Sequence, residues 1–412
     1  MEESYNGGPC MEEIDTQELK LHAPLIPYVQ KHYAKLLPIV KQSKNTAFTN
    51  CIWHEENTAS LAFFANGSYK CFGCGEYGDI ITLVQKIERL SFQEACKMIG
   101  DNVGYEVVLE PPNPLHEEYK DKMNNHTKRY WYNLQKDAGA MQYLKNDRGL
   151  TQDTIDLFRL GLTDTEEYKY RTDIGGIAHR ISIPILEHKK KPKCVGMAYR
   201  TLKDEDPKYL NDINQDGRRE QDPNLAGVFI KGNMLYGYPM AIENIHKQDF
   251  VYLVEGYFDV MSMHQTGVTN VIGSMGTALT EAQMAQISKA TNNVVLFLDN
   301  DSAGTKAMIK SLSSLYSAGL NVAVCQIPGF KDPADLCKRH NFNLGKVSSI
   351  IKGHTRQGIE LVIDTVVSKY ETMVINERTK ALSIAMPIID CVKDEHIKNM
   401  YRSLLNKRLD II

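Results

Sequence analysis

Two short motifs place four metal-binding side chains at the spacing of a zinc site. Cys51 and His54 are three residues apart, and Cys71 and Cys74 repeat that spacing further along the chain. Two such pairs of thiolate and imidazole ligands converge on one tetrahedral ion, and four protein ligands leave no open position for a substrate. We therefore expect these four residues to bind one structural zinc ion.

Three apolar segments in the C-terminal half lead directly into carboxylates. Residues 250–254 precede Glu255 and Asp259, residues 293–298 precede Asp299 and Asp301, and residues 321–327 precede Asp332 and Asp335. Apolar strands that alternate with helices indicate a parallel sheet, and its ligand sites lie at the carboxyl ends of the strands. Clustered carboxylates are stable when a cation neutralises them, and oxygen ligands favour Mg²⁺ or Mn²⁺. Such an ion serves nucleotidyl transfer or phosphodiester cleavage.

Other roles for these acids stay open at this point. Asp301 or Asp332 could cap the helix that follows it, and Glu255 could take up a proton as a general base as well as bind metal. The sequence contains no G-x-x-x-x-G-K-[ST] motif, so a built-in helicase motor is not expected.

The elements that would hold the zinc ligands are a hairpin and two helices. Residues 60–65 and 68–71 read as strands joined by an Asn66-Gly67 turn, which would bring the two ligand pairs together. Residues 79–100 show helical spacing of apolar positions on both sides of Leu90-Ser91. Aromatic residues lie around Lys70 and suit either stacking on unpaired bases or packing of the ribbon: Phe63, Phe64, Tyr69, Phe72 and Tyr77.

The middle of the chain reads as a linker followed by mixed helix and strand. Prolines among acids at 101–120 indicate a linker, and residues 124–158 are helical in pattern, with a break at 147–150 and Thr151 as the next N-cap. Strands are expected at 181–186, 194–199 and 228–230. Five basic residues recur here and read individually as surface charges: Arg148, Arg180, Arg200, Lys208 and Lys231.

Composition limits the class of protein. At 412 residues the chain suggests two or three domains, and 48 Lys plus Arg against 51 Asp plus Glu give no overall basic character. No apolar run reaches the length of a membrane span, and the acidic N-terminal stretch does not read as a signal peptide. We expect a cytoplasmic protein without membrane association.

The order of these motifs resembles the DnaG-type primases of bacteria and their phages. The resemblance covers roughly residues 20–412 and is carried by CIWHEENTAS, CFGCGEYGDI, PKYLN, KGNMLYG, VEGYFDV and LDNDSAG. It implies an α+β multidomain protein. Its parts would be a zinc-ribbon domain at 1–100, a linker at 101–120, a mixed α/β basic subdomain at 121–240, a Toprim parallel-sheet subdomain at 241–345 and C-terminal helices at 346–412.

The resemblance also implies an activity and its partners. The family copies single-stranded DNA into short RNA primers from ribonucleoside triphosphates. Glu255, Asp259, Asp299 and Asp301 match its acidic metal site, and Glu255, Asp299 and Asp301 are the expected catalytic acids. The five basic residues match positions that contact template and nucleotide phosphates.

Two departures from the family stand out. Many relatives have acid-Pro-acid where this chain has Asp332-Pro333-Ala334-Asp335, so Asp335 is the nearby acid that could replace the missing one. Residues 371–412 are similar to the close of the family's polymerase region, so we expect this chain to lack the helicase-binding domain of bacterial members and to work with a replicative helicase supplied as a separate chain, which favours a phage or mobile-element member.

Two rival functions remain. A Toprim nuclease or topoisomerase would use the same carboxylates for cleavage, although a topoisomerase also needs a catalytic tyrosine and a large strand-gating body. A non-catalytic DNA-binding adaptor would use the zinc ribbon to read DNA and the acids as structural groups.

Overall fold

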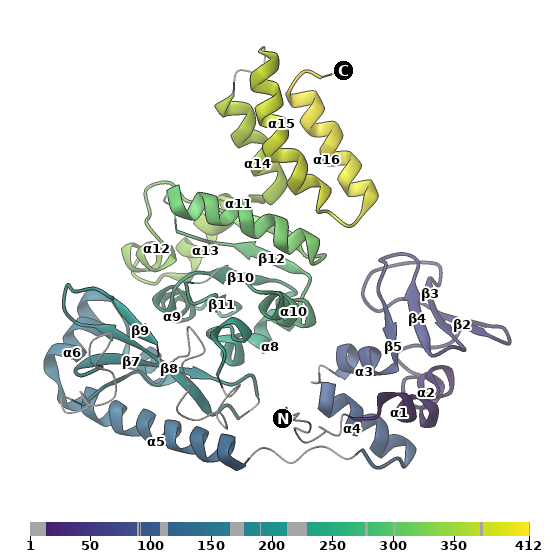
Figure 1. Cartoon of the computed structure of the whole chain (residues 1–412), viewed down its shortest axis with the longest axis horizontal. Coiled ribbons are helices and arrows are strands. Elements are labelled where there is room, and N and C mark those ends of the chain that lie inside the picture. The colour runs from purple at the N-terminus through teal and green to yellow at the C-terminus, as the bar shows by residue number, and fades with distance from the viewer. Residues whose placement is uncertain are drawn as a thin grey trace, which may run out of the picture. The chain divides into compact units, whose positions relative to one another are not determined.

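The computed structural model describes residues 14–88, 90, 92–107, 114–164, 177–189, 191–211, 229–276, 279–299, 302–370 and 374–411 (Figure 1). The chain divides into two compact units, residues 1–112 and 113–412. This division falls within the expected linker, but helices extend into both ends of that segment, up to Val103 and from Pro114 onward. The subdomain boundaries expected inside the second unit stay predictions.

In its described residues, the first unit is an antiparallel sheet with four helices. Its strands pair in chain order and are β1 Lys41–Gln42, β2 Thr46–Thr49, β3 Leu61–Phe64, β4 Ser68–Cys71 and β5 Tyr77–Asp79. Its helices are α1 Thr16–His22, α2 Leu25–His32, α3 Ile80–Glu88 and α4 Phe92–Val103. The expected hairpin is confirmed, since β3 pairs with β4 and the Asn66 side chain accepts the Ser68 N–H at 3.1 Å. The two expected helices are confirmed as well, although α4 continues past Gly100.

The second unit begins with helices packed on a small antiparallel sheet. The helical elements are α5 Pro114–Lys136, α6 Ala138–Gln142, a π-helical turn at Tyr143–Asp147 and α7 Gln152–Leu157, and a short 3₁₀ turn follows later at Lys231–Asn233. The sheet has the order β6 Gly161–Leu162, β7 Arg180–Leu186, β8 Cys194–Thr201 and β9 Tyr209–Asn211. The Thr151 hydroxyl caps α7 as expected, by accepting the Thr154 N–H.

Two expectations for this region are wrong. Helix α5 spans Pro114–Lys136, so helix is already present ten residues before the position at which the pattern predicted it. No strand forms at Phe229–Ile230, and residue 228 lies outside the described part. The strand that pairs with β8 at this edge of the sheet is β9, whose Leu210 is buried against β8.

A predominantly parallel sheet follows, in the order β11-β10-β12-β13-β14, with only β14 antiparallel. Its strands are β10 Val251–Val254, β11 Val271–Gly273, β12 Asn293–Leu296, β13 Asn321–Cys325 and β14 Thr355–Gln357. Its helices are α8 Tyr238–Gln248, α9 Tyr257–Thr266, α10 Glu281–Ala290, α11 Ser302–Ser317, α12 Pro333–Arg339 and α13 Leu344–Gly353. All four residues of β10 are buried, as expected for the centre of a sheet covered on both faces.

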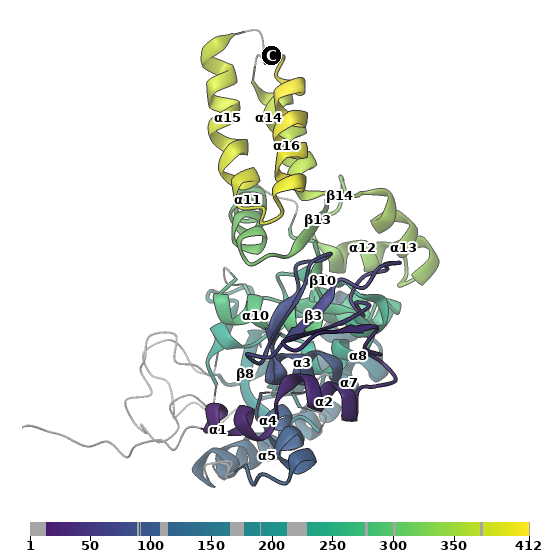
Figure 2. The same ribbon diagram turned by 90° about the vertical axis from the view of Figure 1, so that its right-hand side faces the viewer.

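The chain closes in three helices that pack side by side in both views (Figure 1, Figure 2). They are α14 Gly358–Lys369, α15 Ile375–Asp390 and α16 Glu395–Arg408. The predicted fold class is confirmed: a zinc ribbon, a mixed α/β region, a parallel sheet and C-terminal helices. Within the described ranges, no helix has both the length and the hydrophobicity needed to cross a membrane.

Candidate zinc and divalent-metal sites

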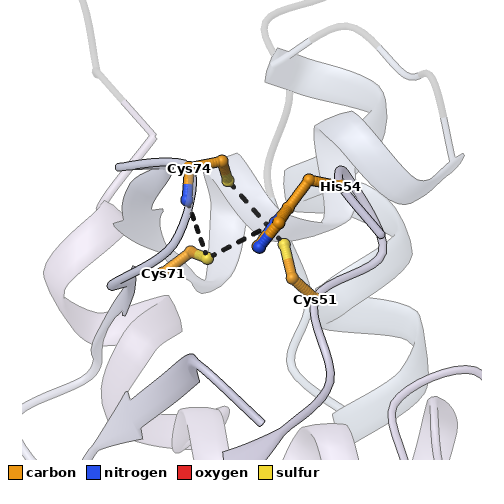
Figure 3. A group of neighbouring side chains, drawn as sticks. All are labelled: Cys51, His54, Cys71 and Cys74. Carbon is orange, nitrogen blue, oxygen red and sulfur yellow. Dashed lines mark hydrogen bonds between the residues drawn. The ribbon is translucent and has the colours of Figure 1, made fainter. Parts of the chain in front are cut away.

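The four expected zinc ligands point toward one another in the first unit (Figure 3). Their ligand atoms all lie within 4.8 Å of one another. The sulfur atoms of Cys51 and Cys74 are 3.8 Å apart, and the Cys71 sulfur is 3.8 Å from Nδ1 of His54. A tetrahedral site with Zn–S bonds of about 2.3 Å has sulfur-to-sulfur edges of roughly 3.8 Å. The quartet therefore fits a zinc ion, and the hairpin of β3 and β4 explains how the pairs meet.

The aromatic residues of the ribbon divide into two groups. Phe63 and Tyr69 are fully buried in the core, so packing is their role. Phe72 and Tyr77 are 62% and 75% exposed. Lys70 lies opposite Tyr77 across the β4–β5 pair, and its ammonium group is 5.8 Å from the Phe72 ring centre. This exposed trio has the chemistry of a surface that stacks bases and attracts phosphate.

Glu255 and Asp299 follow adjacent parallel strands. Leu253 of β10 is paired with Leu296 of β12, and each acid lies two or three residues beyond its paired leucine. Both acids therefore lie at the carboxyl end of the sheet, where ligands bind in such folds. Glu255 lines a cavity of about 210 Å³, together with residues that include Ser274 and Lys310. No sequence pattern points to Lys310, because only the packing of α11 brings it to this cavity.

Asp259 connects the first and third acidic segments. Its carboxylate accepts the N–H of Gly256 at 3.0 Å and the N–H of Ala334 at 3.1 Å. Gly256 permits this closeness, because a Cβ at that position would come within 2.6 Å of Asp259. Burial, followed by the nearby carboxylates of Asp332 and Asp299, raises the pKa of Asp259 to about 7. A divalent cation would relieve this repulsion, so the acids fit such an ion.

The remaining acids differ in their surroundings. Asp332 caps α12 by accepting the Asp335 N–H at 2.7 Å, so the capping role considered for it is real. The Asp335 carboxylate accepts hydrogen bonds from Arg339 Nε at 2.8 Å and from the Lys331 N–H at 3.1 Å. These two contacts do not reach Asp259, and a metal-binding role for Asp335 stays a prediction. Asp301 lies outside the described residues.

Arg148 and Arg200 meet at a single tyrosine. The Nε–H groups of both arginines donate to the Tyr143 hydroxyl, at 2.8 and 2.6 Å. Both guanidinium groups also lie near the Phe258 ring, at 4.5 and 5.9 Å from its centre. Phe258 immediately precedes Asp259, so this arginine pair borders the acidic segment. Sequence reasoning did not identify Tyr143, whose place is fixed by the π-helical turn that it begins.

The other three basic residues are not equivalent. Arg180 is only 5% exposed, and its guanidinium donates to the Pro207 carbonyl and to Glu205. Those contacts hold the β8–β9 connection. Lys208 is exposed, whereas burial lowers the pKa of the half-buried Lys231.

Gln265 links two segments of the second unit that are distant in sequence. Gln265 of α9 accepts the Thr151 N–H at 2.7 Å and donates to the Gly149 carbonyl at 2.8 Å. These bonds connect the segment that carries Arg148 to the helix that carries Asp259.

Family models match the two regions of the chain that carry these residues. Residues 15–113 match the CHC2 zinc finger family, and residues 252–337 match a Toprim-like family. The DNA primase of Clostridium acetobutylicum is 31% identical over 70% of this chain and 51% of its own length. The DNA primase of Aquifex aeolicus is 30% identical over 79% of this chain and 66% of its own length. The chain thus spans about half to two thirds of the length of the curated relatives it matches.

Solved structures show the same fold. The zinc-binding and RNA polymerase domains of the Aquifex aeolicus primase align over 97% of this chain and 98% of that one, with a TM-score of 0.59 and 24% identity. A DnaG primase catalytic domain bound to single-stranded DNA aligns over 71% of this chain and 99% of that one, with a TM-score of 0.57 and 21% identity. Sequence motifs, family matches and fold together identify this chain as a relative of the DnaG-type DNA primases.

Proposed function

We propose that this chain is a DNA primase that synthesises short RNA primers on single-stranded DNA. The observation that carries the proposal is the placement of Glu255, Asp259, Asp299 and Asp332 at the carboxyl end of one parallel sheet, in a chain that also has a zinc quartet. The carboxylates alone suit synthesis and cleavage equally. The choice of synthesis is supported by relatives that are DNA primases.

In this proposal the acidic residues hold one or two Mg²⁺ or Mn²⁺ ions, with Asp301 completing the set. When bound, such ions lower the pKa of an attacking hydroxyl and neutralise the triphosphate. The hydrogen bonds from Gly256 and Ala334 fix the Asp259 carboxylate before any ion arrives. Zinc, held by Cys51, His54, Cys71 and Cys74, is structural.

Arg148 and Arg200 would bind phosphate groups of the nucleotide or template beside these acids. Arginine suits this role because its planar guanidinium presents several donors to phosphate oxygens. Hydrogen bonding of both Nε atoms to Tyr143 directs the outer ends of the two groups. Lys208 and Lys231 would add charge, whereas Arg180 supports the fold of the region through Glu205.

Single-stranded DNA is the proposed template, and a structure of a related catalytic domain is described as bound to single-stranded DNA. The exposed Phe72 and Tyr77 of the ribbon would stack on its bases, with Lys70 near phosphate. Ribonucleoside triphosphates are the proposed substrates. We further propose a separate replicative helicase as partner and the replication fork in the cytoplasm, of a host if the gene is carried by a phage, as the place of action.

Product analysis tests this function. The chain is incubated with single-stranded DNA, labelled ribonucleotides and Mg²⁺, with and without a replicative helicase. We expect short labelled RNA that depends on template. Shortened DNA without labelled RNA would identify a nuclease, and DNA binding without either product in both arms would favour the adaptor.

A further inference from the structure

Glu56 contacts both Cys51 and His54, the first pair of expected zinc ligands. Its Oε1 accepts the Cys51 N–H at 2.6 Å and the Ser60 N–H at 3.1 Å. Its Oε2 lies 3.1 Å from Nε2 of His54. The Glu56 side chain is only 10% exposed, although the neighbouring Glu55 is exposed. One carboxylate therefore closes the loop that carries Cys51 and His54.

The two nitrogens of His54 face different partners. Nδ1 is on the ligand side, 3.8 Å from the Cys71 sulfur, while Nε2 faces Glu56. A carboxylate at Nε2 favours the tautomer with the proton on Nε2, which leaves the Nδ1 lone pair for a metal ion. Gly73 leaves room for this ring position, since a Cβ there would lie 2.3 Å from Nε2.

The same network extends to the second ligand pair. Ser60, whose N–H is bound by Glu56, places its hydroxyl 3.1 Å from the Cys71 sulfur. Glu56 thus contacts Cys51 and His54 directly and Cys71 through Ser60. Such outer hydrogen bonds orient metal ligands, and their loss typically reduces metal affinity by about 10- to 100-fold.

We propose that Glu56 is a positioning residue of the zinc site, which sets the tautomer and orientation of His54 without binding the ion itself. The alternative is that Glu56 only shapes the backbone of the 51–60 loop. The two roles use different oxygens, because Oε1 binds the backbone and Oε2 faces His54. They can therefore be separated, and the inference does not depend on the polymerase activity.

The variant Glu56→Gln separates the positioning role from the backbone role, and Glu55→Gln is the matched control. The amide oxygen of glutamine can still accept hydrogen bonds from the two backbone N–H groups, but its NH₂ group is a donor only and cannot accept a hydrogen bond from the Nε2–H of His54. Zinc release from the whole chain is followed with a chromogenic chelator, and folding is followed by circular dichroism. We expect zinc to leave Glu56→Gln about 10- to 100-fold more readily than the wild type, while Glu55→Gln is unchanged.

Equal zinc retention by Glu56→Gln and the wild type would overturn the proposal, as would equal weakening of both variants. If Glu56→Gln does not fold, ¹⁵N NMR of His54 in the zinc-loaded wild type decides the question. A slowly exchanging, downfield-shifted proton on Nε2, hydrogen-bonded to the Glu56 carboxylate, is the predicted result, and an Nε2 proton that exchanges like that of an exposed imidazole contradicts the proposal.

Discussion

The backbone N–H of Ala334 donates to the carboxylate of Asp259 at 3.1 Å. Ala334 stands where many primases have a second acid. It therefore contacts Asp259 through its main chain, and its side chain takes no part in this bond. The contact ties the start of α12 to the first turn of α9. It also places Asp332 where its charge raises the pKa of Asp259.

The first prediction distinguishes the two acids of this segment. Asp332→Asn should reduce primer synthesis by about 100-fold or more, because it removes a charge beside Asp259 while asparagine still caps α12. Asp335→Asn should reduce primer synthesis by less than about fivefold, because the Asp335 carboxylate is engaged by Arg339 and the Lys331 backbone and not by Asp259. Rates at saturating Mg²⁺ and thermal melts measure both. Equal loss in both folded variants would show that Asp335 carries a catalytic charge.

The second prediction concerns Tyr143. Tyr143→Phe removes the oxygen that accepts both Nε–H groups, and a lost hydrogen bond to a charged donor costs about 1.5 to 3 kcal/mol. We expect KM for nucleotide or template to rise by about tenfold or more, with a smaller change in kcat. Tyr132→Phe, at a tyrosine that is 61% exposed, is the control. An unchanged KM in Tyr143→Phe would count against the proposed phosphate-binding role of Arg148 and Arg200.

The third prediction concerns the ribbon surface. Phe72→Ala and Tyr77→Ala should each weaken binding of labelled single-stranded DNA by about 5- to 150-fold, since stacking contributes about 1 to 3 kcal/mol per base. Their melting temperatures should stay near that of the wild type because both side chains are exposed. Phe63→Ala, in the core, should instead unfold the ribbon. Anisotropy titrations at several salt concentrations measure binding, and unchanged affinity in both exposed variants would exclude this surface.

The fourth prediction concerns acid sensitivity. Burial lowers the pKa of His264 and of His188 to about 4, against an ordinary value near 6.5. The unfolded chain then binds protons that the folded chain does not, so stability is lost as the pH falls from 6.5 toward 4. Between pH 7.5 and 5, each histidine should reduce the free energy of unfolding by roughly 2 kcal/mol. Urea unfolding at several pH values gives the free energy of unfolding of the wild type and of the double variant His188→Gln/His264→Gln. We expect this free energy to fall less steeply with decreasing pH in the variant, and an identical dependence on pH would rule out the two histidines as the cause.

The sequence was most informative where chemistry depends on local spacing. The Cys51–His54 and Cys71–Cys74 pairs and the Asn66 turn determine the zinc geometry over a short stretch, so residue spacing was sufficient to predict it. Carboxylates at strand ends were predictable for a related reason, because parallel strands place their carboxyl ends at one edge.

What the sequence could not show depends on contacts between distant segments. Tyr143 becomes important only because folding brings Arg200 next to Arg148. Arg180 reads like its basic neighbours, yet its burial against Glu205 gives it a structural contact. The prediction of a strand at residues 228–230 failed, because an apolar triplet carries too little pattern to distinguish a strand from a buried loop.

The strand-end carboxylates are proposed to support RNA synthesis. The most direct measurement of this role is template-dependent primer synthesis with Mg²⁺ by Glu255→Gln and Asp299→Asn, each shown by circular dichroism to be folded and by titration to bind single-stranded DNA. We predict that both variants bind DNA like the wild type and lose primer synthesis by about 100-fold or more. Synthesis at the wild-type rate by either folded variant would exclude this role for the carboxylates.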